Sequence, residues 1–357
     1  MKVAVVLGTR PEIIKMSPIV REMDRVGIDF FILHTGQHYS YHMDRVFFEQ
    51  LRLPEPKYNL EVGSGTHAEE TGRMMIGIEK VLTKENPDLV LVEGDTNTVA
   101  AGALASVKLG IKVGHVEAGL RSFDRSMPEE INRIVADHLS EILFAPTERA
   151  KQNLVSEGIS KNVFVTGNTI VDAVYQNLKL AEGSGDPLEG LGVDSDGGYF
   201  LATVHRQENV DSPERFKSIV EGLNLIAERF GVPVLYPVHP RARKRMKEFG
   251  INAGRIKLVD SLDYLTFLRL ESRAKLILTD SGGVQEEACI LGVPCVTLRY
   301  NTERPETVEA GANIVAGTDP ERILECAKLM LGKRRDWENP FGDGTSGRRI
   351  VNIITGL

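Results

Sequence analysis

Residues 277–288 have the sequence Ile-Leu-Thr-Asp-Ser-Gly-Gly-Val-Gln-Glu-Glu-Ala, the pattern of a buried strand, a glycine turn and the first turn of a helix. After Ser281, the residues Gly282 and Gly283 leave backbone N–H groups unobstructed, and the helix directs its positive dipole end toward them. We therefore predict an anion site that fits a diphosphate. Glu286 and Glu287, one turn into this helix, could accept hydrogen bonds from ribose hydroxyls. The alternative is a glycine turn that only lets helix and sheet pack closely.

Short apolar runs alternate with amphipathic segments along the whole chain. The expected strands span residues 3–7, 30–34, 89–93, 112–117, 142–145 and 163–166, and then 199–204, 234–236, 256–259, 275–279 and 294–298. Helix-start signals lie between them, such as Pro11 in a first turn and a capping box formed by Thr66 and Glu69. Strands that alternate with helices predict parallel sheets with crossover helices. The predicted fold class is α/β, with doubly wound, Rossmann-like architecture.

A change of composition at residues 182–198 divides this series in two. Glycine, acidic residues and a proline replace the hydrophobic period there, which is typical of a linker. With 357 residues, the chain also exceeds what one core usually organises. We predict a first domain over residues 1–181 and a second over residues 199–344. Two such domains would face a cleft at the carboxyl ends of their sheets, where open α/β folds bind ligands.

The composition excludes several classes of protein. Lys and Arg total 43 against 50 Asp and Glu, and the net charge of −7 argues against a nucleic-acid-binding surface. Cys289, Cys295 and Cys326 lie in apolar settings without a C-x-x-C spacing, as expected of reduced core residues in a cytosolic protein. The N-terminus lacks the pattern of a secretion signal, and no stretch is long enough to span a membrane. We therefore expect a cytoplasmic location without membrane contact.

Cationic and donor side chains follow several of the predicted strands. Arg10 lies between a strand end and Pro11, where its guanidinium and a helix N-terminus would both face an anion. Lys15 follows five residues later, and for both residues the alternative is an ordinary surface cation. His205 and Arg206 begin a donor-rich loop directly after a strand. His239 also follows a strand, and its alternative is a helix-start histidine bonded to the backbone.

Carboxylates form a second set of candidates. Asp95 follows a strand, although the N-cap of the next helix is the commonest role for such an Asp. Glu117 ends a buried strand, and a Glu is a poor cap. Glu129 and Glu130 fit a first helical turn for purely structural reasons, yet one of them could face the cleft. Three carboxylates in one cleft would supply acid and base roles for breaking a C–H or C–O bond.

Metal and dinucleotide sites are not indicated. His34, His38 and His42 recur every four residues, but the strand-like run ending at His34 and the following Thr35-Gly36 break any helical stack. We therefore predict no metal site here. Neither a P-loop nor a G-x-G-x-x-G turn follows the first strand, which disfavours ATPase and dinucleotide-binding functions.

Several motifs together resemble those of the non-hydrolysing UDP-N-acetylglucosamine 2-epimerases, in the same order and spacing over nearly the whole chain. They are Gly8-Thr9-Arg10-Pro11-Glu12, Thr35-Gly36-Gln37-His38, Gly94-Asp95-Thr96, His115-Val116-Glu117-Ala118-Gly119-Leu120-Arg121, Met127-Pro128-Glu129-Glu130-Ile131-Asn132-Arg133, His205-Arg206, Asp280-Ser281-Gly282-Gly283 and Thr302-Glu303-Arg304-Pro305-Glu306. The resemblance implies a glycosyltransferase-B-like fold, a tail helix at residues 345–357 that returns to the first domain, and a homodimer.

The same resemblance implies an activity. UDP-N-acetylglucosamine and UDP-N-acetylmannosamine would be interconverted by eliminating UDP across C1 and C2 and adding it back to the glycal, without a redox cofactor or metal. Asp95, Glu117 and Glu130 would handle protons at the sugar, with Lys15 in support. The implied substrate-binding residues are Arg10, His205, Ser281, Gly282, Gly283 and Arg304 at the diphosphate, Glu287 at the ribose, Phe267 at the uracil, and also Arg133, Arg206 and His239.

Some features of the resemblance leave more than one function open. Relatives are known for a second UDP-N-acetylglucosamine that acts as an activator, and the matching positions include Gln37, His38 and Arg206. Tyr300-Asn301 departs from the family pattern and could mark a branch that acts on a modified sugar such as a diacetamido uronic acid. The competing functions are those of a hydrolysing epimerase, a transferase of the same fold and a nucleotide-sugar sensor without catalysis.

Overall fold

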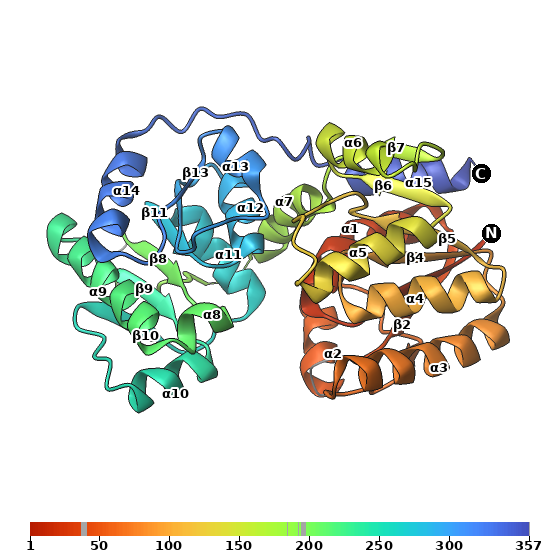
Figure 1. Ribbon diagram of the computed structural model, residues 1–357, viewed down its shortest axis with the longest axis horizontal. Coiled ribbons are helices and arrows are strands. Elements are labelled where there is room, and N and C mark those ends of the chain that lie inside the picture. The colour runs from red at the N-terminus through yellow and green to blue at the C-terminus, as the bar shows by residue number, and fades with distance from the viewer. Residues whose placement is uncertain (37–40, 184, 192, 194–197, 357) are drawn as a thin grey trace. The chain divides into compact units, whose positions relative to one another are not determined.

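The computed structural model describes residues 1–36, 41–183, 185–191, 193 and 198–356. The chain divides into two compact units, one formed by Met1–Gln176 with Phe341–Leu357 and the other by Asn177–Pro340 (Figure 1). Each unit contains one sheet whose strand pairs are all parallel. The predicted α/β class with two parallel sheets is therefore confirmed.

The sheet of the first unit has the order β3-β2-β1-β4-β5-β6-β7. Its strands are β1 (Lys2–Leu7), β2 (Asp29–His34), β3 (Tyr58–Asn59), β4 (Leu89–Glu93), β5 (Lys112–Val116), β6 (Ile142–Ala145) and β7 (Val163–Val165). The chain order reverses between β1 and β4, which is the switch point where open α/β sheets place their ligands. Because all strands run in parallel, the residues that follow β1, β4 and β5 reach the same edge of the sheet.

The helices of the first unit show several of the predicted start signals. They are α1 (Arg10–Val26), α2 (Tyr41–Gln50), α3 (His67–Glu85), α4 (Asn97–Lys108), α5 (Pro128–Leu139), α6 (Glu148–Ser156) and α15 (Ser346–Thr355), together with the first part of α7 (Thr169–Ala181), which continues into the second unit after Gln176. Thr66 and Glu69 form the predicted capping box at α3, and Pro11 lies in the first turn of α1. Helix α15 packs against α1, and Asp172 of α7 accepts bonds from the Ser346 and Gly347 N–H groups at 3.1 and 3.0 Å. The end of the chain is thereby attached to the first unit.

The second unit repeats this architecture with the strand order β10-β9-β8-β11-β12-β13. Its strands are β8 (Phe200–Thr203), β9 (Val234–Pro237), β10 (Ile256–Val259), β11 (Leu276–Thr279), β12 (Cys295–Thr297) and β13 (Asn313–Val315). Its helices are α8 (Gln207–Val210), α9 (Pro213–Phe230), α10 (Pro240–Glu248), α11 (Tyr264–Arg273), α12 (Gly282–Ile290), α13 (Pro305–Glu309) and α14 (Pro320–Gly332). The switch point lies between β8 and β11.

Side chains cover both faces of this second sheet. Phe200 and Ala202 of β8 belong to one hydrophobic cluster, whereas Tyr199 and Leu201 belong to another. Because successive side chains of a strand point to opposite faces, each cluster lies on its own face. Leu188, from the segment predicted as a linker, is buried in the second of these clusters. None of the helices that the structure describes combines the length and apolar character that a membrane crossing requires.

Candidate active site

A lysine and two glutamates lie together at the carboxyl ends of the central strands β4 and β5 of the first sheet. The Nζ atom of Lys15 lies 3.6 Å from Oε1 of Glu93 and also forms an ion pair with Glu117. Glu117 follows β5 directly and has a φ of 69°, a left-handed conformation that non-glycine residues rarely adopt. Glu93 and Glu117 are 1% and 7% exposed. The fold therefore holds the Glu117 carboxylate in place through both its backbone and its cation.

Arg133 joins two further candidates, Asp95 and Glu130. Its guanidinium forms an ion pair with Asp95, and its Nη1 lies 2.8 Å from Oε2 of Glu130. The backbone N–H groups of Ser122 and Phe123 each donate to Glu130 at 2.9 Å. Burial raises the pKa of Glu130, but these bonds and Arg133 outweigh it, so the pKa lies below its usual value. Glu130 is therefore an ionised carboxylate at neutral pH.

The alternative role of Asp95 as a helix N-cap is wrong. The N-cap of α4 is Thr96, and the side chain of Asp95 instead contacts Arg133 of α5. The Nδ2 group of Asn132, also on α5, donates to the backbone oxygen of Asp95 at 2.9 Å. Glu129 and Glu130 do lie in the first turn of α5, and Glu130 is the buried one of the two. Helix α5 thus fixes two of the three predicted carboxylates.

Glu12 is a fourth buried acid beside these residues. The N–H of Thr9 donates to its carboxyl group at 3.1 Å, and the Thr96 hydroxyl donates to its other oxygen. Burial raises the pKa of Glu12 to about 7, although these hydrogen bonds lower it. Glu12 belongs to a sequence motif and Glu93 ends a predicted strand, but neither pattern indicated that both acids would be buried beside the predicted site. A run of apolar strand residues ending in an acid, as at Glu93, is the signal that could have found one of them.

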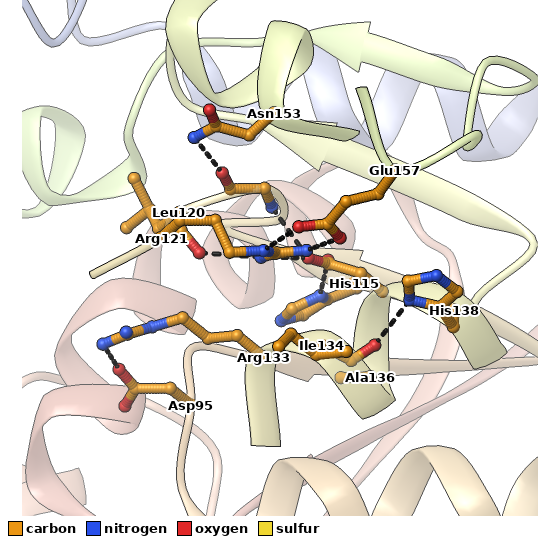
Figure 2. A network of polar contacts seen from close by, with 12 residues as sticks. Asp95, His115, Leu120, Arg121, Arg133, Ile134, Ala136, His138, Asn153 and Glu157 are labelled. Atoms are coloured by element: carbon orange, nitrogen blue, oxygen red, sulfur yellow. Dashed lines mark hydrogen bonds and ion pairs between the residues drawn. The ribbon is translucent and has the colours of Figure 1, made fainter. Parts of the chain in front are cut away.

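A buried ionic network lies around residues on both sides of Glu117 in the chain, and Figure 2 shows His115, Arg121 and Glu157 of this network. Asp137 lies 2.7 Å from both the His115 ring and the Arg121 guanidinium, and it accepts a bond from the Gly119 N–H at 3.1 Å. Arg121 also binds Glu157. Burial lowers the pKa of His115, but the charge of Asp137 and its hydrogen bond outweigh burial and raise it. These contacts fix the residues on both sides of Glu117.

In the second unit, Asp280 organises the loop after β8. Its carboxylate is fully buried and accepts bonds from the backbone N–H groups of His205 and Arg206 at 3.1 and 3.0 Å. The Asn209 side chain donates to it at 3.0 Å. The His205 ring is partly exposed and lies 3.3 Å from Asp280, and burial lowers the pKa of His205. Asp280 therefore holds both the backbone of this loop and the ring of His205.

Ser281, Gly282 and Gly283 form the predicted strand-to-helix turn. Ser281 is the N-cap of α12, and the first two helical residues are Gly282 and Gly283. Neither glycine has a positive φ, and an added Cβ would meet nothing closer than 3.8 Å at Gly282 or 4.0 Å at Gly283. Packing of helix against sheet within the second unit therefore does not require glycine here. A ligand that approaches the backbone closely would require it.

Glu287 lies on α12, and Phe267 lies on the neighbouring helix α11. The Tyr264 hydroxyl donates to Glu287 at 3.0 Å, and the fully buried Glu271 carboxyl faces Glu287. Burial and the charge of Glu287 raise the pKa of Glu271 well above its usual value. Phe267 is partly buried on α11, the helix that also carries Tyr264 and Glu271. Glu287 is thus held by its neighbours rather than freely rotating.

The remaining cations have individual partners. Arg304 lies 2.7 Å from Glu286, and the Arg10 guanidinium lies 5.6 Å from the ring centre of Phe47. The Nδ1 atom of His239 accepts the Arg241 N–H at 3.2 Å, which confirms the helix-start role for His239. Gln37 and His38 lie outside the described residues. Among the described residues, no group of His, Cys, Asp and Glu side chains could hold a metal ion.

Comparison with known proteins identifies the family. The sequence pattern of UDP-N-acetylglucosamine 2-epimerases matches residues 21–355. The chain belongs to this family. The UDP-N-acetylglucosamine 2-epimerase of Methanocaldococcus jannaschii is 59% identical over 99% of both chains. A crystal structure of that epimerase in complex with UDP-GlcNAc and UDP has a TM-score of 0.91 at 58% identity and 100% coverage of both chains.

One further relative and one more distant structure bear on the family and on the fold, respectively. The UDP-2,3-diacetamido-2,3-dideoxy-D-glucuronate 2-epimerase of Pseudomonas aeruginosa is 42% identical over 100% of both chains. A spinosyn rhamnosyltransferase shares the fold with a TM-score of 0.54, at 14% identity and with 100% of this chain and 96% of that one covered. The glycosyltransferase-B-like fold expected from the sequence is therefore confirmed.

Proposed function

We propose that this epimerase-family protein interconverts UDP-N-acetylglucosamine and UDP-N-acetylmannosamine by eliminating UDP and adding it back. The observation that carries the proposal is that each of the three predicted carboxylates is held by a cation. Lys15 binds Glu117, and Arg133 binds both Asp95 and Glu130. Carboxylates held in a fixed position are what the removal and return of a sugar proton require.

The reaction is redox-neutral. A carboxylate takes the C2 proton, the electron pair of the C–H bond forms the C1–C2 double bond, and the C1–O bond breaks as UDP leaves. UDP then returns to C1, and C2 is protonated on the opposite face. Because the C2 proton is not acidic, loss of the anomeric C–O bond accompanies or precedes its removal. Removal of the proton from one face of the sugar ring and its return to the other need an acid or base on each face. This agrees with Asp95, Glu117 and Glu130, which come from different elements of the first unit.

The second unit would bind the leaving group. The N–H groups of Gly282 and Gly283 at the start of α12 are suited to a diphosphate, and the room for a Cβ at both glycines supports close approach of a ligand to the backbone. The Ser281 N–H donates to the Thr279 hydroxyl at 2.9 Å, so Ser281 would contribute to the site through its place at the start of the helix. In the proposal, Arg10, His205 and Arg304 stabilise the charge that develops on UDP, with Arg206 and His239 beside them. Glu287 would accept bonds from the ribose hydroxyls, and Phe267 would border the uracil. No metal or redox cofactor is needed for these steps.

Regulation and assembly belong to the proposal as well. The complex of the Methanocaldococcus jannaschii relative with both UDP-GlcNAc and UDP favours a protein that holds more than one nucleotide. We assign a second, activating UDP-N-acetylglucosamine to a site that includes Arg206, Gln37 and His38. We also propose that the protein is a homodimer.

The second candidate substrate is a UDP-diacetamido-glucuronic acid. The Pseudomonas aeruginosa relative, at 42% identity, carries that substrate class in its name. Arg299 precedes Tyr300-Asn301 and binds Glu303 with two bonds of 2.8 Å. Burial raises the pKa of Glu303, but Arg299 outweighs it and lowers it to about 2. Because Glu303 already occupies Arg299, this arginine is not available for a substrate carboxylate, which favours UDP-N-acetylglucosamine.

Product analysis tests the proposal directly. The protein is incubated with each UDP-sugar, and the products are separated by anion-exchange chromatography. We expect the epimer of UDP-N-acetylglucosamine without free UDP accumulating. Free N-acetylmannosamine with UDP would identify a hydrolase. The variants Asp95→Asn, Glu117→Gln and Glu130→Gln should each bind UDP but lose turnover, whereas a sensor would show no activity to lose.

A further inference from the structure

Glu93 has no role in the reaction described above, yet it lies in the interior of the first unit beside Glu117. It is the last residue of β4, and its side chain is 2% exposed. The Lys15 Nζ is 3.6 Å from Oε1 of Glu93 and also forms an ion pair with Glu117, so two buried carboxyl groups share one cation. The buried Oε1 atom of Glu93 has no hydrogen-bond partner among the described residues. Two such carboxyl groups can form a hydrogen bond with each other only when one of them holds a proton.

The charges that face this pair support a retained proton. Helix α1 contributes one cation, Lys15, together with the acid Glu12, and His115 of β5 is already paired with Asp137. One lysine does not balance two ionised carboxylates in a place from which water is largely excluded. Lys15, Glu93 and Glu117 together carry no net charge when one of the two carboxyl groups holds a proton. This is the arrangement found in acid pairs that share a single proton.

The position of each acid indicates which one holds it. Glu117 forms the close ion pair with Lys15, so Glu117 is the better stabilised anion. Glu93 is farther from Lys15 and deeper in the unit. Burial, acting with the charge of Glu117, raises the pKa of Glu93 well above its usual value, although Lys15 opposes this.

We propose that Glu93 is a positioning residue that keeps a proton and donates it in a hydrogen bond to Glu117. Glu117 then remains the ionised partner of Lys15 and is held for proton transfer at the sugar, a use that rests on the proposed function. The neutral acid also adds a second restraint to a residue with a φ of 69°. An ionised Glu93 would compete with Glu117 for Lys15 and weaken its placement.

The pH dependence follows from this arrangement. Glu93 is protonated below its raised pKa, so the hydrogen bond to Glu117 is present at neutral pH. As the pH rises through that value, Glu93 loses its proton and the two anions repel one another. Turnover should therefore fall on the alkaline side. Glu93→Gln, which keeps an N–H donor but cannot ionise, should lower kcat less than about threefold at neutral pH and remove the alkaline loss.

Infrared difference spectroscopy of the purified protein tests the proton without requiring any activity. The wild-type spectrum should contain the C=O stretch of a protonated carboxylic acid that is absent from Glu93→Gln and still present in Glu117→Gln. Asp88→Asn is the matched control, because Asp88 is an exposed acid at the start of the same strand region. Asp88→Asn should change only carboxylate bands. Glu12 and Glu271 contribute acid bands to both spectra, so they cancel in the difference between wild type and Glu93→Gln. A difference spectrum without an acid C=O band would overturn the proposal.

Kinetics supply the second readout. Glu93→Met, which removes the donor, should lower kcat about tenfold or more with little change in KM, whereas Glu93→Gln should retain most of kcat. Equal losses in both variants would mean that Glu93 acts as a charged anchor for Lys15, and the proposal would be wrong. If no turnover is found with any UDP-sugar, the infrared result still decides the state of Glu93. Failure of the proposed function is thereby distinguished from failure of this inference.

Discussion

Arg133 Nη1 lies 2.8 Å from Glu130 Oε2, one turn away on the same helix. The other end of the same guanidinium binds Asp95, which belongs to the loop after β4. One planar cation therefore sets the distance between two carboxylates that are 35 positions apart in the chain, counted from Asp95 to Glu130. In the proposed mechanism, the placement of both proton-transfer groups depends on this bridge.

We expect Arg133→Lys to lower kcat about 10- to 100-fold. A lysine retains the charge but cannot make bonds to two carboxylates with the geometry of a guanidinium. KM for the UDP-sugar should change less than kcat. Arg125→Lys, at an exposed arginine of the preceding loop, is the matched control. Steady-state kinetics with equal kcat for both variants would contradict the positioning role.

The glycines of the α12 turn provide a test that separates folding from binding. Gly282→Ala and Gly283→Ala should leave the free energy of unfolding within about 0.5 kcal/mol of wild type, because each added methyl has room. UDP affinity, measured by calorimetry, should fall at least about tenfold, because the methyl group occupies the approach to the backbone N–H groups. Gly72→Ala, on the outside of α3, is the control and should not change affinity. Unchanged UDP binding in both α12 variants would argue against a diphosphate seat there.

Asp137 should be among the most sensitive positions for stability. Asp137→Asn replaces a buried carboxylate that faces His115, Arg121 and the Gly119 N–H. The loss of one charge leaves Arg121 poorly compensated, so the free energy of unfolding should fall by about 3–5 kcal/mol. Urea unfolding measures this, with Asp124→Asn on the exposed loop as the comparison. A loss below about 1 kcal/mol would show that the network contributes little.

The pair Glu271 and Glu287 predicts a pH-dependent stability. Burial raises the pKa of Glu271 in the folded protein above its pKa in the unfolded chain. The contribution of Glu271 to the free energy of unfolding is therefore fully present below the pKa of the unfolded state, and it is lost as the pH rises through the pKa of the folded state. Glu271→Gln removes this dependence. The melting temperature of Glu271→Gln, compared with that of wild type at the same pH, should therefore increase from about pH 5 to about pH 8. In the wild-type protein, the charged and titratable groups that face Glu271 are Glu287 and Tyr264. A difference in melting temperature that does not change with pH would contradict a protonated Glu271.

Much of the fold could be predicted from the sequence because apolar runs mark buried parallel strands clearly. The expected strands at residues 89–93, 142–145 and 256–259 coincide with β4, β6 and β10. Strands β3 (Tyr58–Asn59) and β13 (Asn313–Val315) were not predicted, because neither lies within a longer apolar run of the kind that marked the similarly short β7 and β12. Asp95 was open to the wrong assignment as a cap because local sequence cannot distinguish it from Thr96.

The site was predictable only in part, since its residues are paired over long distances. The motifs indicated Lys15 and Glu117 separately, but their ion pair joins positions that are 102 residues apart. Glu12, Glu93 and Lys15 lie close together because of the helix that covers the end of β4. Helix and strand propensities do not predict such packing between elements. Likewise, the buried Asp280 appeared as the end of a strand, whereas the structure shows it holding the His205 loop.

Proton NMR of UDP-N-acetylglucosamine incubated with the protein in heavy water is the most direct test of the proposed chemistry. Elimination and re-addition replace the C2 proton with one from solvent. We predict new anomeric signals of UDP-N-acetylmannosamine and deuterium at C2 in the product. Epimer that retains its original C2 proton, or a spectrum that does not change, would contradict the account.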